Sequence, residues 1–141
     1  FFFGLRATSF LETNGKIELI DKARGDLAIA VDQLMTHPVR AGESKWSSLQ
    51  AAEKLLKAAT EVHGGKFDKV HKLSELAKNL GRLGVGGNIA VHIKKIQCGP
   101  GIRYGEENCT PREAFDAHRA FIMLTIDIFR EQEFRKEAEL G

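Results

Sequence analysis

The stretch that decides the fold is Trp-Ser-Ser-Leu-Gln-Ala-Ala-Glu-Lys-Leu-Leu-Lys-Ala-Ala-Thr-Glu-Val-His-Gly, residues 46–64. At about 100° per residue, its apolar side chains fill one side of a helix: Leu49, Ala52, Leu55, Leu56, Ala59 and Val62. The other side is polar: Gln50, Glu53, Lys54, Lys57 and Glu61. Alanine, leucine, lysine and glutamate also favour helix, and Gly64 supplies a left-handed stop. Pattern and propensity therefore predict a central helix with one buried side.

Two further helices are predicted, one before and one after this stretch in the chain. The first covers residues 16–36 and ends before Pro38, with a polar turn over residues 39–44. Its inward side chains would be Ile20, Ala23, Leu27, Ala30, Val31 and Leu34. The other covers residues 67–80 and ends at Gly81. Its inward side chains would be Val70, Leu73, Ala77 and Leu80.

The last helix carries the clearest start signal. Thr110-Pro111-Arg112-Glu113 places a capping residue before a proline at the first helical position and a glutamate at the third. We expect this helix to reach about residue 137, with a buried side formed by Ala114, Ala117, His118, Phe121, Leu124, Thr125 and Ile128. The glycine-rich residues 82–108 before it would hold a short helix over residues 89–96.

These elements predict an all-α fold: an up-down bundle of four long helices with a short helix or irregular segment before the last one. We expect residues 1–15 to be a poorly ordered lead-in and residues 16–141 to be one domain. No apolar run reaches the roughly 18 residues of a membrane span. The only cysteines, Cys98 and Cys109, form no Cys-x-x-Cys motif, so we expect reduced thiols, no metal site and a cytoplasmic protein.

A series of short motifs gives the chain a family resemblance. In chain order they are Asp26-Leu27-Ala28-x-Ala30, Gln50-Ala51-Ala52-Glu53-Lys54-Leu55-Leu56-Lys57-Ala58, His63-Gly64, His71-x-Leu73-x-x-Leu76 and Arg103-Tyr104-Gly105. Over residues 16–135 this order resembles the HEPN family, the higher eukaryotes and prokaryotes nucleotide-binding domains. Gly105 stands where proline is common in that family, which affects the expected shape of a cleft between helices rather than the fold.

The resemblance implies two classes of activity. One is a non-catalytic partner of a nucleotidyltransferase, which holds nucleotide or RNA phosphate in a cleft between helices. The other is a metal-independent ribonuclease of toxin or defence systems. In that chemistry a histidine moves the proton of the ribose 2′-hydroxyl and an arginine stabilises the developing charge. Neither class implies a cofactor, and the resemblance also implies a homodimer.

Arg112 and His118 are the only pair with the spacing of the ribonuclease motif. On one continuous helix their side chains would point about 120° apart, His118 toward the core and Arg112 toward water with Asp116. We therefore expect a buried histidine and an arginine paired to Asp116. A dimer cleft that collects residues from two chains would restore the catalytic interpretation.

The ligand-binding candidates come from three places in the chain. Arg103 offers a planar fork for phosphate and Tyr104 offers a stacking ring, although an ion pair for Arg103 and a lid role for Tyr104 are equally open. The remaining candidates are Lys54, Lys57, His63 and His71, for which ion pairing, capping and packing are the ordinary roles. The sequence thus predicts a nucleotide- or RNA-phosphate-binding helical module. The alternatives are an endoribonuclease that uses Arg112 and His118, and a dimerisation or interaction module without a ligand.

Overall fold

The protein is an all-α bundle, as the sequence predicts. The computed structural model describes residues 18–67, 69–85 and 89–140, with side chains described up to residue 128. The lead-in predicted for residues 1–15 lies outside these ranges, within which there is no strand. The elements are α2 (Glu18–Thr36), η1 (Pro38–Arg40), α3 (Ala41–Val62), α4 (Leu73–Arg82), α5 (Ile89–Ile96), η2 (Pro100–Tyr104) and α6 (Pro111–Leu140). The short helix predicted for residues 89–96 is therefore confirmed as α5.

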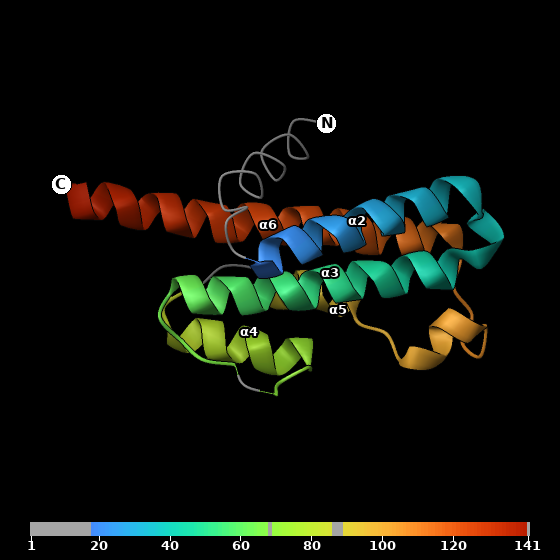
Figure 1. The fold of residues 1–141 in the computed structure, drawn as a ribbon, viewed down its shortest axis with the longest axis horizontal. Coiled ribbons are helices and arrows are strands. Elements are labelled where there is room, and N and C mark those ends of the chain that lie inside the picture. The colour runs from blue at the N-terminus through green and yellow to red at the C-terminus, as the bar shows by residue number, and fades with distance from the viewer. Residues whose placement is uncertain (1–17, 68, 86–88, 141) are drawn as a thin grey trace.

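Helix α3 runs through the middle of the molecule and contacts α2, α4, α6 and η2 (Figure 1). Its alanines allow these neighbours to approach closely, and its leucines fill the space between them. The largest fully buried apolar side chains are Ile20, Leu55, Leu56, Leu76, Leu80, Val85, Ile96, Phe121, Leu124, Ile126 and Ile128. One core therefore holds all the long helices together around α3.

Helix α3 starts five residues earlier than the stretch from which it was predicted. Residues 41–44 are helical rather than a polar turn, and two of them, Ala41 and Ser44, are buried. The Ser44 hydroxyl donates a 2.7 Å hydrogen bond to the Ala30 carbonyl, so the serine satisfies its polar atom inside the interface. The inward assignments of Val31 and Val62 are wrong, since both side chains are at the edge of their apolar stripes and exposed.

Helix α4 (Leu73–Arg82) starts six residues later than predicted and ends two residues after the predicted end at residue 80. The segment before it is held as a turn by the Val70 N–H, which donates to the Phe67 carbonyl at 3.0 Å. The helix continues through Gly81 and stops before Gly84, whose φ of 87° lies in the left-handed region. The helix therefore ends at the second glycine, Gly84, and not at Gly81.

Helix α6 begins with the capping arrangement that its sequence predicts. The Glu113 N–H donates to the Thr110 hydroxyl oxygen at 3.1 Å, and the Glu113 carboxylate accepts from the same hydroxyl at 3.2 Å. Six of its predicted inward residues are buried: Ala114, Ala117, Phe121, Leu124, Thr125 and Ile128. His118 is half-buried, and the helix extends to Leu140, three residues past the predicted end.

Candidate functional site

A polar cleft forms where η2 packs against the start of α3, at one end of the bundle (Figure 1). Ile102 is buried there and its backbone lies directly on Gly42. A side chain at position 42 would overlap the Ile102 carbonyl, so glycine is what lets the η2 backbone touch the helix. This contact fixes the position of the two residues that follow, Arg103 and Tyr104.

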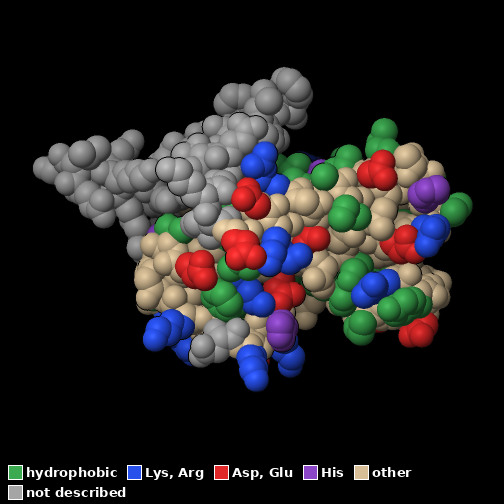
Figure 2. All heavy atoms as spheres, in the orientation of Figure 1, with side chains coloured by type: hydrophobic (Ala, Val, Ile, Leu, Met, Phe, Trp, Pro, Cys, Tyr) green, Lys and Arg blue, Asp and Glu red, His purple; other side chains and the backbone are tan. Residues whose placement is uncertain are grey.

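The cleft, here called the η2 cleft, has a volume of about 540 Å³ and opens to solvent. Its walls come from η1, the first turn of α3 and the η2 segment: Val39, Arg40, Gly42, Glu43, Ile102, Arg103, Tyr104, Gly105, Glu107, Asn108 and Cys109. A second hollow of about 400 Å³ shares Arg40, Glu43, Arg103 and Tyr104 with it and reaches Trp46. Figure 2 shows hydrophobic side chains gathered around a basic one where η2 lies. The volume is adequate for a mononucleotide-sized ligand.

Arg103 is held in this cleft by aromatic rings rather than by a carboxylate. Its guanidinium lies 5.4 Å from the centroid of the Trp46 ring and 5.2 Å from that of Tyr104. Within the part of the chain that the structure describes, it has no ion-pair partner, whereas Arg40 is paired with Glu43. Tyr104 lines the cleft and is 70% exposed. Arg103 thus keeps its donors for an anion, and Tyr104 keeps a face for stacking.

Gly105 explains why the sequence departs from the family pattern at this point. Its φ is 76°, in the left-handed region, and its N–H donates to the Gly101 carbonyl to end η2. Proline is restricted to φ near −65° and has no N–H, so it could make neither feature. The glycine therefore shapes the turn that presents Arg103 and Tyr104.

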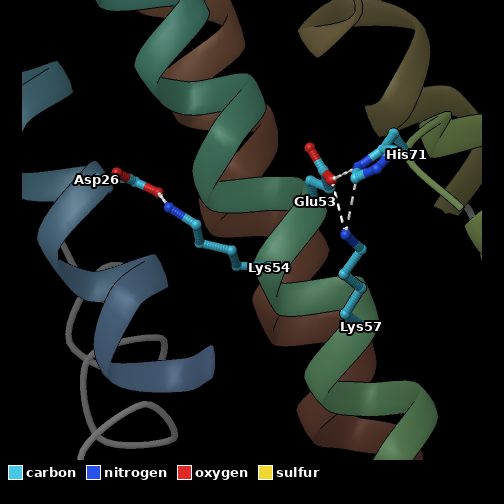
Figure 3. Close-up of polar contacts among 5 residues, drawn as sticks. All are labelled: Asp26, Glu53, Lys54, Lys57 and His71. Atoms are coloured by element: carbon cyan, nitrogen blue, oxygen red, sulfur yellow. Dashed lines mark hydrogen bonds and ion pairs between the residues drawn. The ribbon is translucent and has the colours of Figure 1, made fainter. Parts of the chain in front are cut away.

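A second group of predicted binding residues lies farther along α3 (Figure 3). Glu53 accepts from Lys57 at 2.8 Å, and its Oε1 lies 2.7 Å from His71 Nδ1. The Lys57 ammonium also lies 5.5 Å from the centroid of the Phe67 ring. Burial alone would raise the pKa of the Glu53 carboxyl, but the hydrogen bonds from Lys57 and His71 outweigh it and hold that pKa below its ordinary value of 4.5. This cluster fastens the segment before α4 to α3.

Lys54 points to the opposite side of α3, where it is paired with Asp26 of α2 (Figure 3). Both lysines predicted as ligand contacts therefore bind carboxylates of the chain itself. Trp46 and Lys57 are eleven residues apart on one helix, which is about 16 Å along its axis. The structure thus separates Lys54, Lys57 and His71 from the η2 cleft.

We expect Glu53→Gln to destabilise the protein by about 1–2 kcal/mol at pH 7, because Lys57 then loses its charged partner. A carboxyl with a lowered pKa stabilises the fold fully above pH 4.5, and this contribution is lost as the pH falls through the folded-state value. Between pH 7 and pH 3, the free energy of unfolding measured in urea should therefore fall less for the variant than for the parent. Glu61→Gln, exposed on the same helix, is the matched control and should leave the pH dependence unchanged.

The two residues of the ribonuclease motif are turned apart on α6. Arg112 is exposed and pairs with Asp116 at 3.2 Å, as the helical pattern predicts. His118 is turned inward: its Nδ1 is buried without a hydrogen-bond partner, and burial lowers its pKa. Within one chain, then, no described contact joins Arg112 to His118, and their catalytic assignment stays a prediction.

The last predicted binding residue, His63, caps α3. It is half-buried, and its backbone N–H donates to the Ala59 carbonyl at 3.1 Å. Among the described residues no group of three or more metal-ligating side chains comes together. Neither does any described helix have the length and apolarity needed to cross a membrane.

Sequence reasoning missed three polar features of the structure. Arg40 lines the η2 cleft and Trp46 lines the second hollow beside it, although only their positions, after Pro38 and at the start of the 46–64 stretch, could have indicated this. His92 Nε2 and Asp127 Oδ2 lie 2.8 Å apart and connect α5 to α6 in a half-buried position. A contact between residues 35 positions apart leaves no local pattern in the sequence.

The comparisons with known proteins give one match. The profile of the HEPN domain matches residues 18–117, more than half of the 141-residue chain. No curated protein and no solved structure matches the chain significantly. The matched region spans α2 to the first turns of α6 and includes every residue of the η2 cleft.

Proposed function

Because the chain belongs to the HEPN domain family, a family of nucleotide- and RNA-related helical modules, we propose that it binds a nucleotide or RNA phosphate in the η2 cleft. One observation carries the proposal: a guanidinium without a carboxylate partner among the described residues lies beside an exposed tyrosine in a polar cleft. Phosphate needs a charged donor and a nucleobase needs an aromatic face. Arg103 and Tyr104 supply the two within one turn of chain.

In this proposal each residue has a separate role. Arg103 donates two parallel hydrogen bonds to phosphate oxygens, and Trp46 holds its guanidinium in place from behind. Tyr104 stacks on the base. Arg40 lines the same cleft, where Glu43 holds its guanidinium in position, and offers further N–H donors. The site needs no metal or cofactor for binding alone.

The partner of the module follows from the same family relation. We propose a nucleotidyltransferase as its catalytic partner and a homodimer as its form in solution. Exposed apolar side chains on α2, η1 and the first turns of α6 support a protein contact there: Ile29, Met35, Val39 and Phe115. Of these four side chains, Val39 also lines the η2 cleft.

Replacing Arg103 is the direct test. We expect ATP to raise the melting temperature of the parent protein. Arg103→Ala should remove that increase and reduce the affinity for ATP about tenfold or more, because hydrogen bonds to charged groups contribute about 1.5–3 kcal/mol. Tyr104→Ala should weaken binding and Tyr104→Phe should preserve it, because only the ring is needed for stacking. Arg24→Ala, an exposed arginine on α2, is the control and should bind as the parent does.

The other outcomes separate the alternatives. If purified protein degrades RNA in the presence of a chelator, and His118→Ala abolishes this while remaining folded, the protein is a ribonuclease. If neither ATP nor RNA changes the melting temperature and no RNA is degraded, the interaction module is correct and the cleft proposal is wrong.

A further inference from the structure

A second hollow of the molecule, unlike the η2 cleft, is apolar and lies between α4 and α5. Helix α4 packs on α3, on the side away from α2 (Figure 1), and α5 packs mainly on α6. A groove of about 460 Å³ is left between α4 and α5. We call it the α4–α5 groove, and its lining residues are Ser74, Ala77, Lys78, Gly81, Val85, Ile89, Ala90, Ile93, Lys94 and Gln97. None of these residues also lines the η2 cleft.

The α4–α5 groove has an apolar floor and walls of small side chains. Buried aliphatic side chains form the floor: Val85, Ile89 and Ile93. The small residues of the walls leave the space above this floor open: Ser74, Ala77 and Gly81 on α4, and Ala90 on α5. The three on α4 are spaced at i, i+3 and i+7, so they share one face of the helix. The groove is therefore about two helical turns, or roughly 10 Å, long.

Each wall of the groove carries one lysine, Lys78 on α4 and Lys94 on α5. Neither has a carboxylate partner among the described residues, unlike Lys54 and Lys57. The surrounding sequence is basic throughout, because residues 76–105 contain five lysines and arginines and no aspartate or glutamate. Figure 2 shows lysine and arginine side chains along the edge of the molecule where α4 lies. The groove therefore combines an apolar floor with positive charge on both walls.

The shape and the lining of the groove favour a helix as its occupant. Ser74, Gly81, Ala90 and Gln97 are exposed, so the groove is open along its length and does not enclose a small molecule. None of the described lining residues is aromatic, so a nucleobase would have no ring to stack on. A helix does fit, because its side chains at i, i+3 or i+4, and i+7 enter an open apolar groove together. Carboxylates on either side of that stripe would face the two lysines.

We propose that the α4–α5 groove binds an amphipathic helix of another protein, whose aliphatic stripe lies on the apolar floor and whose flanking carboxylates pair with Lys78 and Lys94. The apolar contact supplies most of the affinity, because ion pairs at an exposed rim contribute little. The lysines select an acidic partner and increase the rate of association. Binding here is independent of nucleotide binding in the η2 cleft, because the two sites share no residue.

The test uses the full chain and a fluorescein-labelled synthetic peptide of about 18 residues, long enough to form a helix in solution. This glutamate peptide has leucine and alanine on one face and glutamate on both flanks. Two control peptides carry glutamine or lysine in place of the glutamates. Fluorescence anisotropy should show saturable binding of the glutamate peptide, about fivefold tighter than that of the glutamine peptide, and no binding of the lysine peptide. The difference between the first two should decrease as the salt concentration is raised.

Gly81→Leu is the variant that blocks the groove. A Cβ at position 81 would meet no heavy atom of the described residues within 4 Å, and leucine favours helix more than glycine, so the variant should fold at least as well as the parent. Its side chain occupies the groove and should weaken the glutamate peptide at least about tenfold. Gly25→Leu, in an equally open position of α2, is the matched control and should bind as the parent does. Lys78→Gln and Lys94→Gln should each weaken the glutamate peptide about two- to threefold and leave the glutamine peptide unchanged.

Three results would overturn the proposal: the glutamate peptide does not bind, the lysine peptide binds equally well, or Gly81→Leu is folded and binds as the parent does. Amide chemical-shift mapping on the isotope-labelled chain decides between the other occupants. If sodium decanoate or an oligoadenylate shifts the signals of α4 and α5 and the glutamate peptide does not, the groove takes a small amphiphile or RNA and the helix is wrong. Arg103→Ala should bind the glutamate peptide with parent affinity, so failure of nucleotide binding and failure of peptide binding are distinguishable.

Discussion

Phe121→Ala is expected to lower the free energy of unfolding by about 3–5 kcal/mol, because it leaves a cavity at the centre of the core. The Phe121 side chain is fully buried, and it lies on the side of α6 that packs against α3. Truncation removes a whole aromatic ring from contact with rigid neighbours that relax only in part. The measurement is urea unfolding followed by circular dichroism at pH 7.

The matched control lies on the same helix. Phe115 is 47% exposed, so Phe115→Ala should change the unfolding free energy by less than about 1 kcal/mol. The two substitutions remove the same atoms from one fully buried and one exposed ring. Equal effects of the two variants would show that α6 does not present Phe121 to the core.

Gly42→Ala is expected to destabilise the protein by about 1–3 kcal/mol and to abolish ATP binding. The new methyl group would overlap the Ile102 carbonyl, which is backbone and cannot turn away as a side chain can. Helix α3 itself tolerates alanine, so the strain is relieved by moving η2 off the helix. Arg103 and Tyr104 then move with η2, and the cleft loses its shape. Urea unfolding and an ATP titration measure the two effects.

Gly25→Ala is the matched control for Gly42→Ala. Gly25 also lies within a helix, α2, and a methyl group there would meet nothing within 4 Å. Its replacement should stabilise the protein by up to about 1 kcal/mol through helix propensity and leave ATP affinity unchanged. If Gly42→Ala is as stabilising as Gly25→Ala and binds ATP normally, the contact with Ile102 does not hold the cleft together.

The candidate site was only partly predictable. Arg103 and Tyr104 are adjacent in the chain, so one short motif was enough to indicate them, and the structure gives both residues room for a ligand. Lys54 and Lys57 were grouped with them because they share a polar helix face. Whether a lysine is available to bind a ligand depends on which carboxylates lie near it in the folded protein. Here Asp26 and Glu53 occupy the two lysines.

Errors in the fold occurred at the boundaries of the helices. Residues 39–44 have the polar composition of a turn, yet Ala41 and Ser44 are buried, and the Ser44 hydroxyl bonds to the Ala30 carbonyl of α2. The stop of α4 fell at Gly84 rather than Gly81, since Val85 is part of the core and its N–H bonds to the Leu80 carbonyl at 3.0 Å. In each case a contact with a distant segment overrode a local signal.

The sequence by itself determined the all-α class, the central position of α3, the capped start of α6 and the family, because helical periodicity and capping act over only a few residues. Only the tertiary structure decided which charged groups pair, where η2 sits, and that Trp46 holds Arg103. Those contacts join segments that lie far apart in the chain. The free energy of each such contact depends on how far apart its two side chains lie in space. The number of residues between them in the sequence does not give that distance.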